Sequence, residues 1–306
     1  MEKLLSLQIT IFLLVAVGFG LKRGKIIGPQ GQKNLTDLVI YVILPCNILK
    51  AFLSGMRSET AESVFSSYMG IFLLSLFLQA FCVLYGKVVF RREPEGKRKC
   101  LEYGIICSNA GFLGNPVAEG VYGASGLVLA SIYLIPQRVM MWSFGIAIFS
   151  GVKDFRQTFR KVVTHPCILA CVLGIVGMLT KTQLPPALSG AVAALGNCNT
   201  AMSMMVIGMI LEEIKGKDFW DFTVVRYTIH RLVVIPAIVY LICRIFPVSD
   251  MVFGASVLLA AMPAGATTSI LAEKYGMEPG FATKMVVCST LASLPTVCLW
   301  GMVLPH

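Results

Sequence analysis

Residues 107–116 read CSNAGFLGNP, and residues 261–269 read AMPAGATTS. Each stretch places glycine, proline and small polar residues inside a longer apolar run. Proline removes one helical hydrogen bond and clashes with the preceding turn. In a membrane, the backbone groups freed in this way must be satisfied by protein, water or a ligand. A pair of interrupted apolar segments therefore points to a transporter binding site. Two ordinary kinked helices are the alternative interpretation.

The composition of the whole chain predicts a membrane protein. Of 306 residues, 56% are hydrophobic and 14% are charged, and the mean hydropathy is +0.78. Soluble domains carry about 25% charged residues, and a helix that crosses the bilayer needs about 20 apolar residues. We predict an all-α polytopic fold with ten transmembrane helices, at residues 4–21, 35–54, 64–86, 100–120, 126–151, 166–180, 186–211, 222–246, 251–273 and 281–304. The first run lacks an A-x-A cleavage site and is expected to be retained.

Lysine and arginine predict the orientation of these spans. Twenty of the 26 basic residues, with Arg226 and Arg231 among them, fall on the side of the loops that follow spans 1, 3, 5, 7 and 9. Five fall on the opposite side, and Arg138 lies within a span. Because cytoplasmic loops are enriched in these residues, we expect a multi-pass protein of the cell membrane with both termini outside. The net charge of +10 is attributed to topology and lipid headgroups, not to nucleic acid.

Ten spans divide into two halves of five around a basic loop. The predicted units are residues 1–151, the cytoplasmic loop 152–165, and residues 166–306. An odd number of spans in each half forces the second half to enter the membrane inverted relative to the first. The two interrupted segments then occupy the fourth place of each half, which is where inverted-repeat transporters place their broken helices.

At these residues the sequence resembles the auxin efflux carrier family, which includes bacterial malate and malonate permeases. The matching stretches are YVILP at residues 41–45, SNAGFLGNP at 108–116, AMPAGATT at 261–268, LAEKYG at 271–276 and STLASLPT at 289–296. The resemblance implies a fold like that of sodium/proton antiporters, with broken helices 4 and 9 crossing near the midplane, and elevator-type transport. The plant members have a long loop between spans 5 and 6. The short loop here implies a metabolite carrier of the prokaryotic type, with auxin an improbable substrate.

The first group of expected substrate-binding residues lies at this crossing. Half-helix N-termini present free N–H groups and a positive dipole end to an anion, and each half-helix is expected to start at a proline. The group comprises Asn109, Asn115, Pro116, Pro263, Thr267 and Thr268. For the asparagine and threonine side chains, hydrogen bonding between packed helices is the alternative.

A second group recurs in spans 2 and 7. It comprises Pro45, Asn47, Asn197 and Asn199. Asparagine in an apolar helix is costly unless it is paired. We therefore expect these side chains either to line the substrate site or to bind carbonyl groups freed by the broken helices.

Gln137 and Arg138 lie near the middle of span 5. A charge at that depth costs at least about 2.5–3.5 kcal/mol on insertion scales and is by default a functional hypothesis. Arginine can bind a carboxylate through two parallel hydrogen bonds. The alternative is a structural ion pair with Glu119 or contact with span 4 carbonyl groups.

No carboxylate falls in the middle of a predicted span, which disfavours a sodium/proton exchanger with a buried aspartate pair. If a proton or sodium ion is coupled to transport, Glu119, Asp37 and His230 are the candidates. His230 is flanked by Arg226 and Arg231 and is more simply an interfacial or hydrogen-bonded histidine.

Other classes of function find little support. Residues 123–126 read GASG, a match to the G-x-S-G string of intramembrane serine proteases, but this pattern is short and lies in a predicted outer loop. No metal-binding, nucleotide or other cofactor motif is present, and the ten cysteines contain no C-x-x-C pair. We therefore expect a permease for small organic anions without a cofactor or metal, compatible with a homodimer. A channel or a substrate-sensing receptor on the same fold is the alternative.

Overall fold

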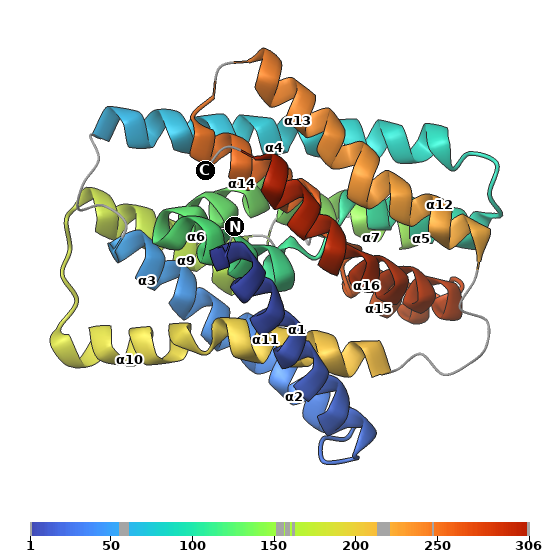
Figure 1. Ribbon diagram of the computed structural model, residues 1–306, viewed down its shortest axis with the longest axis horizontal. Coiled ribbons are helices and arrows are strands. Elements are labelled where there is room, and N and C mark those ends of the chain that lie inside the picture. The colour runs from blue at the N-terminus through green and yellow to red at the C-terminus, as the bar shows by residue number, and fades with distance from the viewer. Residues whose placement is uncertain are drawn as a thin grey trace.

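The computed structural model describes residues 2–54, 61–150, 156, 160, 163–212, 221–246 and 248–304. Regular structure in this part of the chain is helical, apart from one antiparallel bridge between Ser108 and Ala264. Figure 1 labels most of the helices. They are α1 Glu2–Arg23, α2 Pro29–Leu38, α3 Leu44–Ser54, α4 Ala61–Val89, α5 Glu95–Ile106, α6 Asn115–Met140, α7 Ile146–Ser150, α9 Pro166–Leu179, α10 Pro186–Asn197, α11 Asn199–Glu212, α12 Phe222–Ile229, α13 Ile235–Ile245, α14 Asp250–Ala260, α15 Thr267–Lys274 and α16 Pro279–Val303.

Several helices continue into one another through π-helical turns, at Val39–Ile43, Ala110–Gly114, Met141–Gly145 and His230–Val234. Counted this way, six segments of the described chain are long and apolar enough to cross a membrane: Pro29–Ser54, Phe65–Val89, Ala110–Phe149, Pro186–Glu212, Phe222–Ile245 and Pro279–Val303. The shorter helices α9 and α14 are also apolar. The predicted all-α, multi-pass architecture is confirmed, whereas the ten-span inverted repeat stays a prediction.

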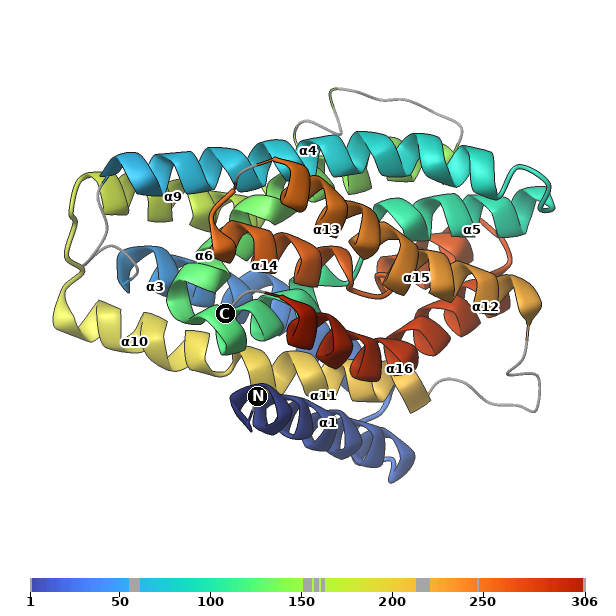
Figure 2. The same ribbon diagram turned by 45° about the horizontal axis from the view of Figure 1, so that its top comes forward.

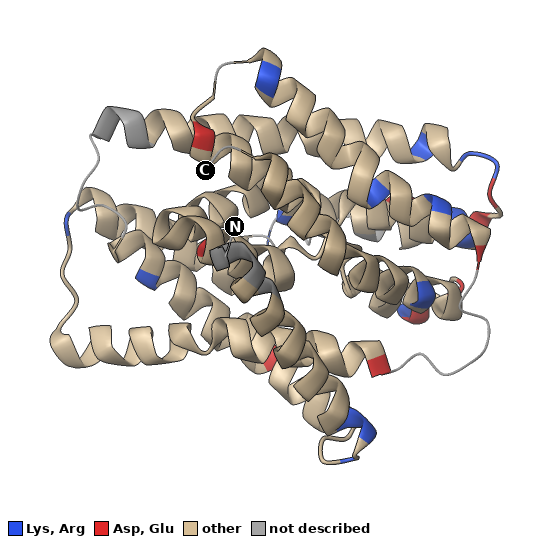
Figure 3. Cartoon of the chain, in the orientation of Figure 1, with Lys and Arg blue, Asp and Glu red and all other residues tan. Residues whose placement is uncertain are grey.

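The surface of these helices fits a lipid solvent. Leu73 and Phe77 in the middle of α4 are 53% and 54% exposed, and Leu173 of α9 is 61% exposed. Figure 3 shows that most of the described charged residues lie near helix ends and in connections, leaving the middles of the helices largely uncharged. Exposed apolar side chains along helix middles, with charges toward the ends, are the arrangement expected of a protein surrounded by hydrocarbon.

Both predicted interruptions are present. Helix α5 ends at Ile106 and helical turns resume at Ala110, while α14 ends at Ala260 and α15 begins at Thr267. The expectation that a proline starts each half-helix is met in part. Pro116 lies in the first turn of α6, although π-helical turns already resume at Ala110. For Pro263 the expectation is wrong, because this residue lies inside the extended stretch. The chain leaves the helix where its backbone pairs with the other broken segment, and the prolines lie beside those points.

Helices α1 and α11 approach each other so closely that their backbones touch. A Cβ atom added to Gly18 of α1 would lie 2.0 Å from the carbonyl oxygen of Met205, and one added to Gly208 of α11 would lie 2.0 Å from that of Val15. Figure 2 shows the two helices side by side. Small residues permit this approach between membrane helices, where lipid supplies no hydrophobic drive for association.

We expect Gly18→Ala to destabilise the protein by about 1–3 kcal/mol, because the new methyl group meets backbone atoms that cannot rotate away. The measurement is thermal unfolding of the purified protein in detergent. Gly20→Ala is the matched control, since a Cβ atom there meets nothing within 4 Å and alanine favours the helix. Equal melting temperatures for the two variants would show that the α1–α11 contact is looser than the structure has it.

Candidate functional site

The two broken segments cross and bind each other through their backbones. The N–H of Asn109 donates to the carbonyl oxygen of Pro263 at 2.8 Å, and the N–H of Gly265 donates to that of Cys107 at 3.0 Å. These bonds flank the bridge between Ser108 and Ala264. Part of the backbone released by each break is therefore satisfied by the other break, which is how irregular backbone is tolerated away from water.

Two side chains from other helices satisfy further groups of the breaks. The amide Nε2 of Gln137 donates to the carbonyl oxygen of Ser108 at 2.7 Å, and the Ser108 hydroxyl donates to Oε1 of Gln137 at 3.0 Å. In the other break, the N–H of Ala264 donates to the hydroxyl of Ser289 in α16 at 3.2 Å. Gln137 thus holds the first break in position. Ser289 was not among the expected site residues, although it begins the STLASLPT stretch.

Arg138, next to Gln137, is the side chain best suited to bind an anion. Its side chain is buried, at 6% exposure, and its Nη1 has no hydrogen-bond partner. Within the described part of the chain it forms no ion pair, and the alternative pair with Glu119 is not made. A buried guanidinium without a counter-ion is costly, so this position favours a bound anion.

The neighbourhood of Arg138 includes His165, the residue that caps α9 and accepts the N–H of Cys167. Burial, together with the Arg138 charge, lowers the pKa of His165 to about 4. Because the pKa is lowered, His165 is neutral at every pH well above 4. It therefore adds no second positive charge beside Arg138 under ordinary conditions.

The polar side chains expected at the crossing divide into engaged and free groups. Thr267 is engaged, since its hydroxyl accepts from Tyr103 Oη at 3.0 Å. Asn115 is fully buried and both atoms of its amide lack partners, and the hydroxyl of Thr268 is likewise buried and without a partner. Asn109 is 7% exposed and contributes its backbone N–H to the crossing. Asn115 and Thr268 are thus the side chains there with unused hydrogen-bonding capacity.

Asn47 of span 2 and Asn197 of span 7 lie in a separate polar cluster with Glu119. Asn47 Nδ2 donates to Glu119 Oε2 at 2.9 Å, and Lys50 Nζ lies 3.7 Å from Glu119 Oε1. Lys50 also donates to Asn197 Oδ1 at 2.8 Å. Three segments far apart in sequence thus meet at this cluster, α3, α6 and the end of α10.

The remaining expected residues lie elsewhere. Asn199 is buried and accepts from Ser203 at 3.2 Å, with its Nδ2 unpartnered, and Pro45 lies in the first turn of α3. The imidazole Nδ1 of His230 is 2.5 Å from Tyr85 Oη, as the interpretation of a hydrogen-bonded histidine predicts. Asp37 is an exposed residue of α2.

One basic residue that was used to predict orientation has a buried side chain. Arg231 is 3% exposed, and its Nε has no hydrogen-bond partner in the described part of the chain. It lies in the π-helical turn between α12 and α13. Its place as the tenth residue of the predicted span 222–246, followed by Leu-Val-Val, was the available signal that its side chain turns inward.

Comparisons with known proteins agree with a transporter. A family model described as membrane transport protein matches residues 5–158 and 152–301. An uncharacterized transporter of Methanocaldococcus jannaschii is 24% identical over 305 residues, which covers 98% of each chain. An uncharacterized transporter of Methanothermobacter thermautotrophicus is 25% identical over 312 residues, which covers 97% of each chain.

Proposed function

Because the chain belongs to the membrane transport protein family, as its resemblance to auxin efflux carriers predicts, we propose that it is a secondary carrier of small organic anions, with carboxylates as the preferred class. The observation that carries this proposal is the buried, unpaired guanidinium of Arg138, one residue from the side chain that holds the first broken segment. A carboxylate would supply the missing counter-charge in a bidentate geometry.

The crossing offers further groups that suit an anion. The first turn of α15 and the turn that resumes at Ala110 lie on either side of the paired breaks, and helix N-termini favour negative charge. Asn115 and Thr268 carry free polar atoms beside these turns. A carboxylate held by Arg138 would have neutral hydrogen-bond donors available from both broken segments.

The transport mechanism that fits this site is elevator-type alternating access on two inverted repeats of five spans, residues 1–151 and 166–306, with both termini outside the cell membrane. The pairing of the two broken segments with each other supports it. So do two features of the predicted ten-span division, in which both broken segments take the fourth place of their halves and the basic loops alternate along the chain. Broken helices meeting at a repeat interface are typical of carriers built in this way.

Uptake into proteoliposomes tests the function. Vesicles containing the purified chain should accumulate at least one labelled anion from a panel of malate, malonate, lactate and indole-acetate, with saturation and with competition by unlabelled anion. Empty vesicles are the control. Flux without saturation would identify a channel, and ligand binding without flux would identify a receptor. If the protein neither binds nor transports any organic anion of the panel, the proposed function is wrong.

Coupling of transport to a proton or sodium ion can be measured in the same vesicles. Glu119 is the coupling candidate that contacts Asn47 and Lys50, and Lys50 also donates to Asn197 of the second repeat. In Glu119→Gln, exchange of labelled for unlabelled anion should persist while stimulation by an imposed pH or sodium gradient is lost. A variant that still responds to the gradient would assign Glu119 a structural role.

A further inference from the structure

A pocket at the end of the α4–α5 hairpin is lined by basic residues on one wall and apolar residues on the other. Its volume is about 490 Å³. Lys87 and Arg91 come from the end of α4 and the turn that follows it, and Arg98 and Lys99 come from α5. The opposite wall is formed by Phe144, Ala147 and Ile148.

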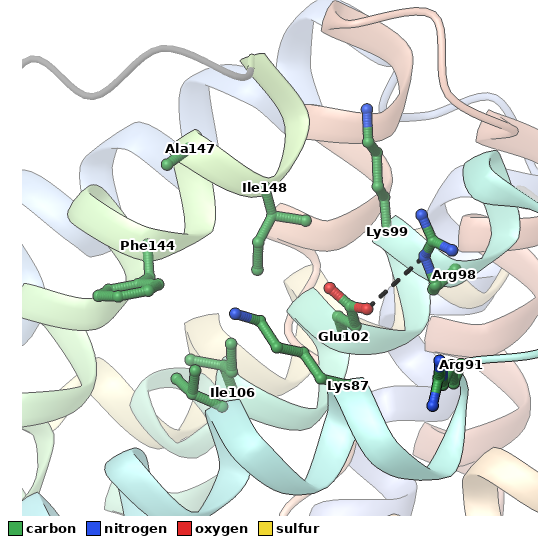
Figure 4. A pocket seen from close by; sticks show the side chains of 10 residues that line it. Lys87, Arg91, Arg98, Lys99, Glu102, Ile106, Phe144, Ala147 and Ile148 are labelled. Carbon is green, nitrogen blue, oxygen red and sulfur yellow. Dashed lines mark ion pairs between the residues drawn. The ribbon is translucent and has the colours of Figure 1, made fainter.

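The charges of this pocket are only partly compensated. Arg98 Nε lies 3.8 Å from Glu102, and Lys99 Nζ lies 2.9 Å from Glu95, which is outside the pocket lining. Lys87 and Arg91 form no ion pair within the described part of the chain. Figure 4 shows Lys87 extending into the space between α5 and the wall that carries Phe144 and Ile148. Four cations against the single carboxylate of Glu102 create a site for an anionic group.

The apolar surroundings indicate which kind of anion fits. Phe144 is 39% exposed, and next to Lys87 on the outer surface of α4 lie Leu84 and Val88, among the most exposed apolar side chains of the protein. In a membrane, acyl chains would cover such residues. A ligand with an anionic head and hydrocarbon tails would meet the cations and the apolar wall at the same time.

We propose that this pocket binds the phosphate headgroup of an anionic phospholipid. This site is distinct from the anion site at the crossing and does not depend on the proposed substrate. It also has a route to influence transport. Ile106, which lines the pocket, is the last residue of α5 before the first break, and Tyr103 of the same helix bonds to Thr267 across the crossing. A lipid bound here would stabilise the end of α5, where the helix stops at the first break.

Native mass spectrometry of the full chain in detergent tests the proposal, with phosphatidylglycerol as the probe and phosphatidylcholine as the neutral comparison. The pocket variant is Lys87→Gln combined with Arg91→Gln. The control is Arg23→Gln combined with Lys33→Gln, which removes the same charge from the α1–α2 hairpin. We expect wild type to retain phosphatidylglycerol preferentially and the pocket variant to bind it about 25-fold more weakly, since each basic residue near an anionic lipid contributes about a factor of five. The control variant should match wild type.

The proposal is overturned if wild type shows no preference for phosphatidylglycerol, or if the pocket and control variants lose lipid equally. It is also overturned if the pocket variant retains lipid as wild type does but is no longer stabilised against heat by free carboxylates. The last result would assign the pocket to the transported anion. If the double variant does not fold, Arg91→Gln alone serves, because Arg91 is an exposed turn residue and its loss should still weaken retention about fivefold.

Discussion

Replacing Arg138 with glutamine lowers carboxylate uptake by about 100-fold or more and leaves the protein folded. Removing one partner of a desolvated charge pair costs about 2–5 kcal/mol, and about 2.7 kcal/mol corresponds to a factor of 100. The Arg138 guanidinium has no counter-charge in the described chain. Replacing Arg138 therefore breaks no ion pair in the described chain, and we expect the melting temperature to stay the same or rise.

The measurement is initial uptake into proteoliposomes at several substrate concentrations, together with thermal unfolding of the same preparations. Arg23→Gln is the matched control, because Arg23 is an exposed residue in the last turn of α1. The idea that Arg138 binds the anion fails if Arg138→Gln transports normally. It also fails if the variant loses its folded state while Arg138→Lys retains both fold and uptake, since a positive charge would then be needed for structure.

Replacing Asn115 with leucine, a side chain of similar size, lowers uptake by about 10- to 100-fold without loss of stability. A hydrogen bond to a charged group contributes about 1.5–3 kcal/mol. Both amide atoms of Asn115 are buried without a partner. A polar group buried in that way is itself destabilising, so an apolar replacement should keep or raise the melting temperature.

Gln137→Leu provides the contrast at the same crossing. Gln137 makes two hydrogen bonds to Ser108, and their loss leaves a buried carbonyl group unsatisfied, at a cost of about 1–3 kcal/mol. We therefore expect Gln137→Leu to lower the melting temperature, and Asn115→Leu to leave it unchanged. If Asn115→Leu is the less stable of the two, Asn115 is a structural residue whose partners form only in the membrane.

Much of the crossing could be predicted from local sequence. The clusters of Gly, Pro and small polar residues at 107–116 and 261–269 identified both interruptions, because glycine and proline act on the backbone within one or two turns. The starting points of the half-helices could not be placed from the prolines. Helical turns resume at Ala110 and at Thr267, because pairing between the two breaks decides where each chain leaves its helix.

For the same reason, the sequence could not predict which individual polar side chains would have hydrogen-bond partners. Gln137 and Arg138 are neighbours in sequence, yet Gln137 is fully engaged and Arg138 is unpaired. Arg231, counted at the start of span 8, has a buried side chain. Whether a polar side chain finds a partner depends on the helices packed around it, and no hydropathy pattern reports those contacts.

The sequence by itself determined that the chain is a multi-pass helical membrane protein with two interrupted segments, since these properties follow from apolar run lengths and backbone-breaking residues. Only the tertiary structure decided which polar groups meet. Asn47 reaches Glu119 across 72 positions of the chain, and Lys50 reaches Asn197 across 147. Such partners are chosen by how whole helices pack, and packing also decides which buried charges, such as Arg138, form no ion pair in the described chain and so are available to a ligand.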